Sequence, residues 1–184
     1  MFSCEIRMTP CRKLRLIAIS LVLGCTAGCD QATKHLARTE FTQAGFPKLT
    51  GLPARFIEFN LAENPGAFLG LGDSLPFTIR STLTVGVGFG LVLLLAYLVR
   101  APKLRWPSFL GLALIWAGGM SNLVDRFARH GLVTDFMVVR VGPLHTGVFN
   151  LADLAIVIGT VMLVVSWHAD RRRREVHREK GAKG

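Results

Sequence analysis

Long apolar runs, separated by short polar stretches, dominate the pattern of the chain. Residues 81–99 and 106–124 carry no charged side chain, and each run is about long enough to cross a ~30 Å hydrocarbon core at 1.5 Å per residue. A first block reaches spanning length only by running through Asp30 and Lys34, and a last block carries Asp153. The pattern predicts four membrane-spanning helices, at about 14–36, 77–99, 106–125 and 148–169.

The segment from 38 to 76 is too polar and too broken to span. Pro47, Gly51 and Pro53 interrupt it, and residues 55–61 partly alternate polar and apolar side chains as a strand does. The predicted fold class is therefore an all-α membrane protein with four transmembrane helices and a small extracytoplasmic β-sheet on the outer membrane surface. We expect residues 1–184 to form one membrane domain, with a charged tail at 170–184 that frays as a helix end or a disordered segment.

Charge gives the predicted orientation. Apolar residues make up 51% of the chain and charged residues 18%, with a net charge of +10. The N-terminal segment, the 100–105 turn and the tail hold 14 of the 22 Lys and Arg residues. Because basic residues are retained on the cytoplasmic side, both termini are predicted to be cytoplasmic and segments 38–80 and 126–147 to face outward. No nucleic-acid-binding motif accompanies the charge, so nucleic acid is not an expected partner.

This topology places four carboxylates at one depth, near the outer interface. Asp30 lies about 20 Å along the outward-going first helix, and Asp125 ends the outward-going third. Asp153 lies near the start of the inward-going fourth helix, and Asp135 is expected on the loop before it. Acidic groups at membrane depth are costly and usually functional.

Other chemistries lack their motifs. The chain has no H-E-x-x-H, no G-x-S-x-G and no histidines at metal-ligand spacing, so neither a metal nor a cofactor is expected. Ser121 is better explained as a small residue for helix packing than as a nucleophile. Residues 26–29 resemble a lipoprotein cleavage signal ending at Cys29, but three more spans follow, so we expect an uncleaved first helix. A lipoprotein, and a small transporter that uses buried carboxylates, remain the alternatives.

Two adjacent carboxylates suffice for peptide hydrolysis. When they approach closely, one pKa rises and the pair shares a proton. The ionised member can take a proton from water as the water attacks a peptide carbonyl, while the protonated member polarises that carbonyl. Such a site needs no metal and no nucleophilic side chain.

Five ordered motifs carry a resemblance to a known family. They are Asp30-Gln31-Ala32-Thr33-Lys34, Asn64-Pro65-Gly66-Ala67-Phe68, Gly118-Gly119-Met120-Ser121-Asn122-Leu123-Val124-Asp125-Arg126, Val133-Thr134-Asp135-Phe136 and Phe149-Asn150-Leu151-Ala152-Asp153. With these motifs the chain resembles the lipoprotein signal peptidases, or signal peptidase II, over nearly its whole length. It departs from the family in two places. After Asn64, the run Pro65-Gly66-Ala67-Phe68 lacks the second alanine of the commoner N-x-G-A-A-F pattern, and Ser121 stands where glycine is usual.

The resemblance implies a catalytic pair formed by Asp135 and Asp153. The residues that it implies in substrate binding or support are Asp30, Lys34, Asn64, Gly66, Asn122, Asp125, Arg126, Asn150 and Ala152. For Asp30 the residues also allow a structural role, as a cap or an ion pair with Lys34 one turn on. Asp125 beside Arg126 suggests a structural ion pair.

The resemblance also implies a substrate and a place in the cell. The family removes signal peptides from diacylglyceryl-modified prolipoproteins and cuts before the lipidated cysteine. We therefore expect a multi-pass protein of the bacterial cytoplasmic (inner) membrane, with its site near the outer face and lipid chains between its helices. No obligatory protein partner is implied, and a monomer is expected.

Overall fold

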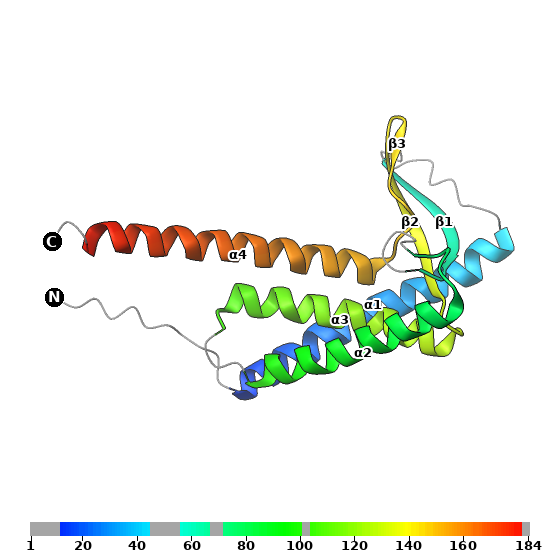
Figure 1. The fold of residues 1–184 in the computed structure, drawn as a ribbon. Coiled ribbons are helices and arrows are strands. Elements are labelled where there is room, and N and C mark those ends of the chain that lie inside the picture. The colour runs from blue at the N-terminus through cyan, green and yellow to red at the C-terminus, as the bar shows by residue number, and fades with distance from the viewer. Residues whose placement is uncertain (1–11, 45–55, 67–71, 101–103, 182–184) are drawn as a thin grey trace.

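The computed structural model describes residues 12–44, 56–66, 72–100 and 104–181. Its helices run alongside one another, and its strands cross one end of them, which we call the sheet end (Figure 1). Four helices are long and apolar enough to cross a membrane. The predicted fold class, four spanning helices with a small sheet, is confirmed. The elements in chain order are α1 (Arg12–Ala44), β1 (Ile57–Asn64), α2 (Phe77–Arg100), α3 (Trp106–Ala128), β2 (Val133–Val141), β3 (Leu144–His145) and α4 (Leu151–Gly181).

Helix α3 is the centre of the bundle. It packs against the other three helices and carries more buried residues than α2. Its Gly111 and Gly118 lie so close to α4 that a Cβ at either would lie within 3 Å of a backbone oxygen of that helix. Small residues of this kind let helix backbones approach closely in a membrane, where apolar side chains gain little from leaving lipid. The apolar core on the other side of α3 consists of Ile19, Leu91, Leu98, Phe109, Ala113, Trp116, Ala117 and Leu123.

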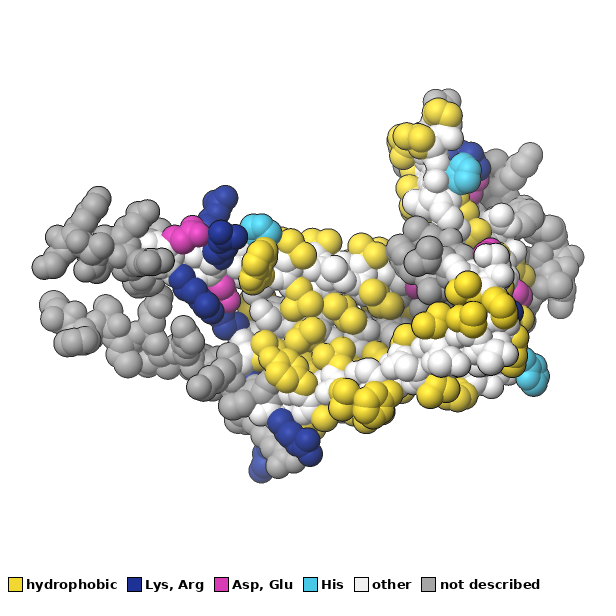
Figure 2. Space-filling view, in the orientation of Figure 1, with side chains coloured by type: hydrophobic (Ala, Val, Ile, Leu, Met, Phe, Trp, Pro, Cys, Tyr) yellow, Lys and Arg dark blue, Asp and Glu magenta, His cyan; other side chains and the backbone are white. Residues whose placement is uncertain are grey.

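The outer surface of the helices is apolar. Large hydrophobic side chains on α1, α2 and α4 are exposed, as expected of residues that face lipid. Figure 2 shows these side chains over the middle of the bundle, with most of the visible Lys and Arg at the end away from the sheet. This separation of charge along the bundle is the one on which the predicted orientation rests.

Helices α1 and α4 depart most from their predicted limits, while α2 and α3 begin as predicted and end shortly after their predicted ends. Helix α1 continues past residue 36 to Ala44, so the segment from 38 begins inside a helix rather than as a surface stretch. The reason is tertiary: Ala37 is buried, and the Arg38 guanidinium donates to Thr134 Oγ1 of β2 (3.0 Å), so these residues pack against the sheet. The turn residues predicted at 45–55 lie outside the described residues.

Helix α4 begins at Leu151, three residues later than predicted, and continues through most of the tail that was expected to fray. Its start is fixed by the side chain of Asn150, which accepts a hydrogen bond from the Asp153 N–H (2.9 Å). Along the extension, the ion pair of Arg171 with Glu175, one turn on, supports the helix.

The sheet has the strand order β1-β2-β3, and both pairs are antiparallel. Strand β1 was predicted at 55–61 and lies at Ile57–Asn64, with an irregularity in the pairing between Phe59 and Ala62. Strand β2 was not predicted: Asp135 lies within it, opposite Ala62, and not on a loop. This register brings the end of β1 to the catalytic candidate on β2.

Candidate active site

Two aspartates on α1 and α3 share one lysine. The Lys34 ammonium lies 2.6 Å from Asp30 Oδ2 and 2.8 Å from Asp125 Oδ2, and all three side chains are almost completely buried. The same ammonium donates to Asn122 Oδ1 (3.0 Å). The ion pair considered for Asp30 and Lys34 is therefore present within α1, and the pair of Lys34 with Asp125 joins α1 to α3.

Asp30 also touches the start of α4. Its Oδ1 accepts the Ala152 N–H (2.9 Å), one of the first backbone donors of that helix, which have no partner within the helix. Its Oδ2 accepts the Ser121 hydroxyl (2.7 Å) in addition to the Lys34 ammonium. Ser121, expected to serve packing only, is therefore a buried donor to Asp30.

Asp153 occupies the first turn of α4 in a reciprocal capping arrangement. The Asn150 Oδ1 accepts the Asp153 N–H, and Asp153 Oδ2 accepts the Asn150 N–H (3.3 Å). Its other oxygen accepts Asn122 Nδ2 (2.9 Å). A carboxylate at this end of a helix also lies where the helix dipole favours negative charge.

Asp135 is held by two amides. Asn64 Nδ2 donates to its Oδ2 (2.8 Å), and Asn150 Nδ2 donates to its Oδ1 (2.6 Å). The pKa of Asp135 is raised from 3.8 to about 6, mainly by burial and also by the Asp153 carboxylate, while the two amide hydrogen bonds oppose the rise. Asn150 thus contacts both carboxylates that the sequence singles out, with its amide on Asp135 and its backbone N–H on Asp153.

Arg126 has a different role from the one expected. Among the described residues, no ion pair joins it to Asp125, whose cation is Lys34. Arg126 Nη2 donates to the Gly66 carbonyl (2.7 Å), and Nη1 donates to the Asn122 carbonyl one turn earlier (3.1 Å). The prediction of an Asp125–Arg126 pair was wrong because the two side chains of neighbouring helical residues point in different directions.

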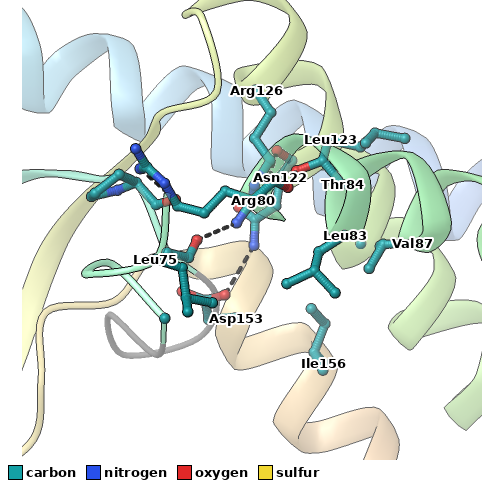
Figure 3. A pocket seen from close by; sticks show the side chains of 14 residues that line it. Leu75, Arg80, Leu83, Thr84, Val87, Asn122, Leu123, Arg126, Asp153 and Ile156 are labelled. Carbon is teal, nitrogen blue, oxygen red and sulfur yellow. Dashed lines mark hydrogen bonds between the residues drawn. The ribbon is translucent and has the colours of Figure 1, made fainter. Parts of the chain in front are cut away.

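A cavity of about 200 Å³ opens beside this network, between α2, α3 and α4. Asp153 and Asn122 lie on its wall, joined by their hydrogen bond (Figure 3). Two arginines, Arg80 and Arg126, border the same space. Asp135 is not among the residues that line it. The lining is otherwise largely apolar and includes Leu75, Leu83, Val87, Leu123 and Ile156.

Sequence reasoning missed three polar residues that the structure brings to the network. Gln31 Nε2 donates to Asp125 Oδ1 (3.0 Å), and Thr134 accepts from α1 at the edge of the site. Arg80 donates to the Pro65 carbonyl (3.2 Å). The signal that could have indicated such residues is a charged or polar side chain near the end of a span, because burying a polar group there is costly and usually serves a function. The described residues hold no group of three His, Cys, Asp or Glu side chains suited to a metal ion.

The chain is similar to known proteins over most of its length. The family model described as Signal peptidase (SPase) II matches residues 14–168. A lipoprotein signal peptidase of Syntrophus aciditrophicus is 35% identical over 157 residues, covering 83% of this chain and 93% of the relative. One of Desulforapulum autotrophicum is 38% identical over 154 residues, covering 81% and 90%.

A solved structure shares the fold. It is a bacterial membrane enzyme determined by the in meso method at 2.3 Å resolution, with a TM-score of 0.67 and 21% identity, covering 83% of this chain and 88% of its own. At that identity the likeness concerns the fold alone. The family match spans the four helices, the sheet and every motif of the buried network, and on that basis the chain belongs to the signal peptidase II family of membrane proteases.

Proposed function

We propose that the chain is an aspartic endopeptidase that removes signal peptides from diacylglyceryl-modified prolipoproteins, cutting before the lipidated cysteine. The observation that carries the proposal is the pair of buried carboxylates, Asp135 and Asp153, both bonded to Asn150. They come from a strand and a helix that the fold brings together. Family membership supports the substrate class, because its members are named lipoprotein signal peptidases.

The reaction needs one proton on the pair. The ionised carboxylate accepts a proton from a water molecule while the water oxygen bonds to the peptide carbonyl carbon. The protonated carboxyl donates to the carbonyl oxygen, which becomes the hydroxyl of a tetrahedral intermediate. As the C–N bond breaks, a proton passes to the leaving amine and the carbonyl reforms. The pair is left with one proton and is ready for another turnover.

The surroundings suit a charged pair at membrane depth. Asp30, Asn122 and Asn150 hold the first turn of α4 and both oxygens of Asp153 in place. The cavity beside Asp153 has an apolar wall, which would accept an apolar part of a lipidated substrate. The exposed basic residues at the opposite end favour a cytoplasmic location for both termini, with the site near the outer face of the bacterial inner membrane.

The sheet favours the same placement. Because Val141 pairs with Leu144 and Ile57 pairs with Val139, these side chains share one face. Val141, Leu144 and Ile57 are exposed apolar residues, so this face would rest on the outer membrane surface. Nothing in the pair chemistry requires a second chain, and we propose that the protein acts as a monomer.

The test is cleavage by the purified full-length chain in micelles, with a diacylglyceryl-modified prolipoprotein peptide. Mass spectrometry should find a released signal peptide and a product that begins at the lipidated cysteine. Asp135→Asn and Asp153→Asn should each abolish release while the proteins stay folded. Glu58→Gln, which neutralises an exposed carboxylate of β1, should leave release unchanged. If both asparagine variants still cleave, the assignment of the pair is wrong.

The same preparation tests the alternative of a lipoprotein. Helix α1 runs without a break through Cys29, and Asp30 and Lys34 just beyond it are bound into the site. We therefore expect the intact mass of the mature protein to include residues before Cys29. A lipidated chain beginning at Cys29 would contradict an uncleaved first helix.

A further inference from the structure

Two arginines hold consecutive carbonyls at the end of β1. Arg80, in the first turns of α2, donates from Nη1 to the Pro65 carbonyl (3.2 Å). Arg126, near the end of α3, donates from Nη2 to the Gly66 carbonyl (2.7 Å). Both border the cavity beside Asp153 (Figure 3). The backbone at residues 65–66 is thus fixed to two different helices.

What this backbone carries is the side chain of Asn64. Its Oδ1 accepts the Gly66 N–H (2.8 Å), and its Nδ2 donates to Asp135 Oδ2 (2.8 Å). A backbone N–H can only donate, so the bond to Gly66 decides which end of the amide faces Asp135. Any movement of residues 65–66 therefore changes the donor that Asp135 receives.

We propose that Arg80 is a positioning residue of the active site, which holds the Asn64 amide on Asp135 by binding the Pro65 carbonyl. Arg80 acts through Pro65 and Asn64 and is not itself a catalytic residue. The inference rests on the proposed function, since it takes Asp135 as a member of the catalytic pair. It adds a residue that lies outside the sequence motifs and on a different helix from the rest of the network.

The surroundings of Arg80 indicate that its guanidinium is placed there for a purpose other than charge pairing. It lies on a span, borders an apolar cavity, and forms no ion pair with any described residue. Its Nε is buried and has no hydrogen-bond partner within the described part of the chain. A permanent charge in such a place is costly, and the guanidinium offsets part of that cost through its directed hydrogen bond to the Pro65 carbonyl.

The effect on Asp135 can be told from a general loss of structure by its pH dependence. The groups that act on Asp135 are the Asp153 carboxylate from α4, the Lys34 ammonium from α1, and the Arg126 guanidinium from α3. The amides of Asn64 and Asn150 also donate to it. Weakening the Asn64 bond removes one influence that lowers the Asp135 pKa, so that pKa can only rise further.

The experiment is a double-variant cycle on the full-length protein in micelles, with the lipidated peptide as substrate. Arg80→Met keeps the length of the side chain and removes every donor; Arg80→Gln is the second variant if the first does not fold. Each is combined with Asn64→Ala. Arg140→Gln, which removes an exposed arginine of the sheet bonded to Glu58, is the matched control. The readouts are kcat, KM and the pH profile of kcat.

For Arg80→Met we expect kcat to fall on the order of tenfold to a hundredfold with KM little changed, because misplacement of a reacting group acts on the chemical step. The pH profile should move up by about 0.5 to 1 unit, since a hydrogen bond to a charged group is weakened. In the Asn64→Ala background the same substitution should add no further shift. Arg80→Lys, which keeps the charge and a donor group of different geometry, should recover part of the loss.

Three results would overturn the inference. An unmoved pH profile with lowered kcat would make Arg80 a structural residue only. A raised KM at unchanged kcat would make it a contact of the substrate in the cavity. Full additivity with Asn64→Ala would show that it does not act through Asn64. The proposed function fails separately: if Asp135→Asn still cleaves, the pair is wrong whatever the Arg80 variants do.

Discussion

Lys34 is the single cation on which the buried part of the site depends most. Its ammonium contacts Asp30 at 2.6 Å, Asp125 at 2.8 Å and Asn122 Oδ1 at 3.0 Å, and its side chain is fully buried. Replacing it with methionine keeps the volume and removes the charge. We expect the variant to lose both stability and activity, for two reasons that can be measured apart.

The loss of stability follows from the distances. At an effective dielectric constant of about 20, each contact with a carboxylate is worth about 6 kcal/mol of Coulomb energy. The sum is not lost in full, because the cluster relaxes and water can enter. Removing one partner of a buried ion pair costs about 3–5 kcal/mol, since a buried charge is left uncompensated. Here two carboxylates, Asp30 and Asp125, are left, so we expect the upper part of that range.

The loss of activity follows from Asn122. With Lys34 gone, its Oδ1 keeps only the bond from Asn150 Nδ2 (3.1 Å), so the amide that faces Asp153 is less firmly oriented. Activity should therefore fall even where the variant is folded.

Denaturant titration in mixed micelles and the cleavage assay separate the two effects. Lys34→Met combined with Asp30→Asn and Asp125→Asn removes the uncompensated charge and should recover most of the stability, but not the activity. Lys13→Met, at an exposed lysine of the same helix, is the control. The reasoning is refuted if Lys34→Met unfolds within about 1 kcal/mol of the parent, or if the combined variant is no more stable than the single one.

Two further predictions concern Asp135 and the packing of α3 on α4. Because the folded pKa of Asp135 is about 6 rather than 3.8, the folded protein binds the extra proton between these values. The unfolding free energy should fall as pH rises through that window, by up to about 3 kcal/mol, and Asp135→Asn should lack this fall in denaturant titrations at pH 4 and 7. Gly118→Ala would place a Cβ 2.4 Å from the Ala152 carbonyl oxygen, so it should lower stability by about 1–3 kcal/mol and reduce cleavage, whereas Gly90→Ala, with open space around it, should do neither.

The spans could be predicted where the sequence lacks competing signals. Residues 81–99 and 106–124 are free of charge, and α2 and α3 begin where these runs predict. At the end of α1 the predicted limit of 36 was too early, because the helix continues to Ala44. Its polar residues Lys34 and Arg38 are bound to α3 and to the sheet. Tertiary contacts determine where the helix ends, and local hydropathy carries no information about those contacts.

Strand β2 was missed for a similar reason. Its first four residues are all buried, so the alternation that marks a strand with one wet face is absent. The partners of the site residues were also beyond the sequence. The motifs include Asn64, Asn122 and Asn150. The hydrogen-bond partners that orient these side chains include backbone groups, however, and a motif of residue types does not identify backbone partners.

Those three asparagines share one arrangement. In each, Oδ1 accepts from a group that can only donate: the Gly66 N–H for Asn64, and the Asp153 N–H for Asn150. For Asn122 the donor is the Lys34 ammonium. An amide whose oxygen is committed in this way must present its NH₂ on the other side. In all three cases a carboxylate oxygen of the proposed catalytic pair lies there.

This arrangement explains why the site uses asparagine where aspartate would have the same shape. An aspartate offers two acceptors, and at any of the three positions it would turn an oxygen toward a carboxylate instead of a donor. A third carboxylate would bring a further negative charge beside the pair and remove a hydrogen bond that favours its ionised member. The amides of Asn64 and Asn150 therefore oppose the rise that burial causes in the pKa of Asp135. Under the proposed function, Lys34 and the arginines that hold residues 65–66 act on the reaction by keeping those amides turned toward the two carboxylates.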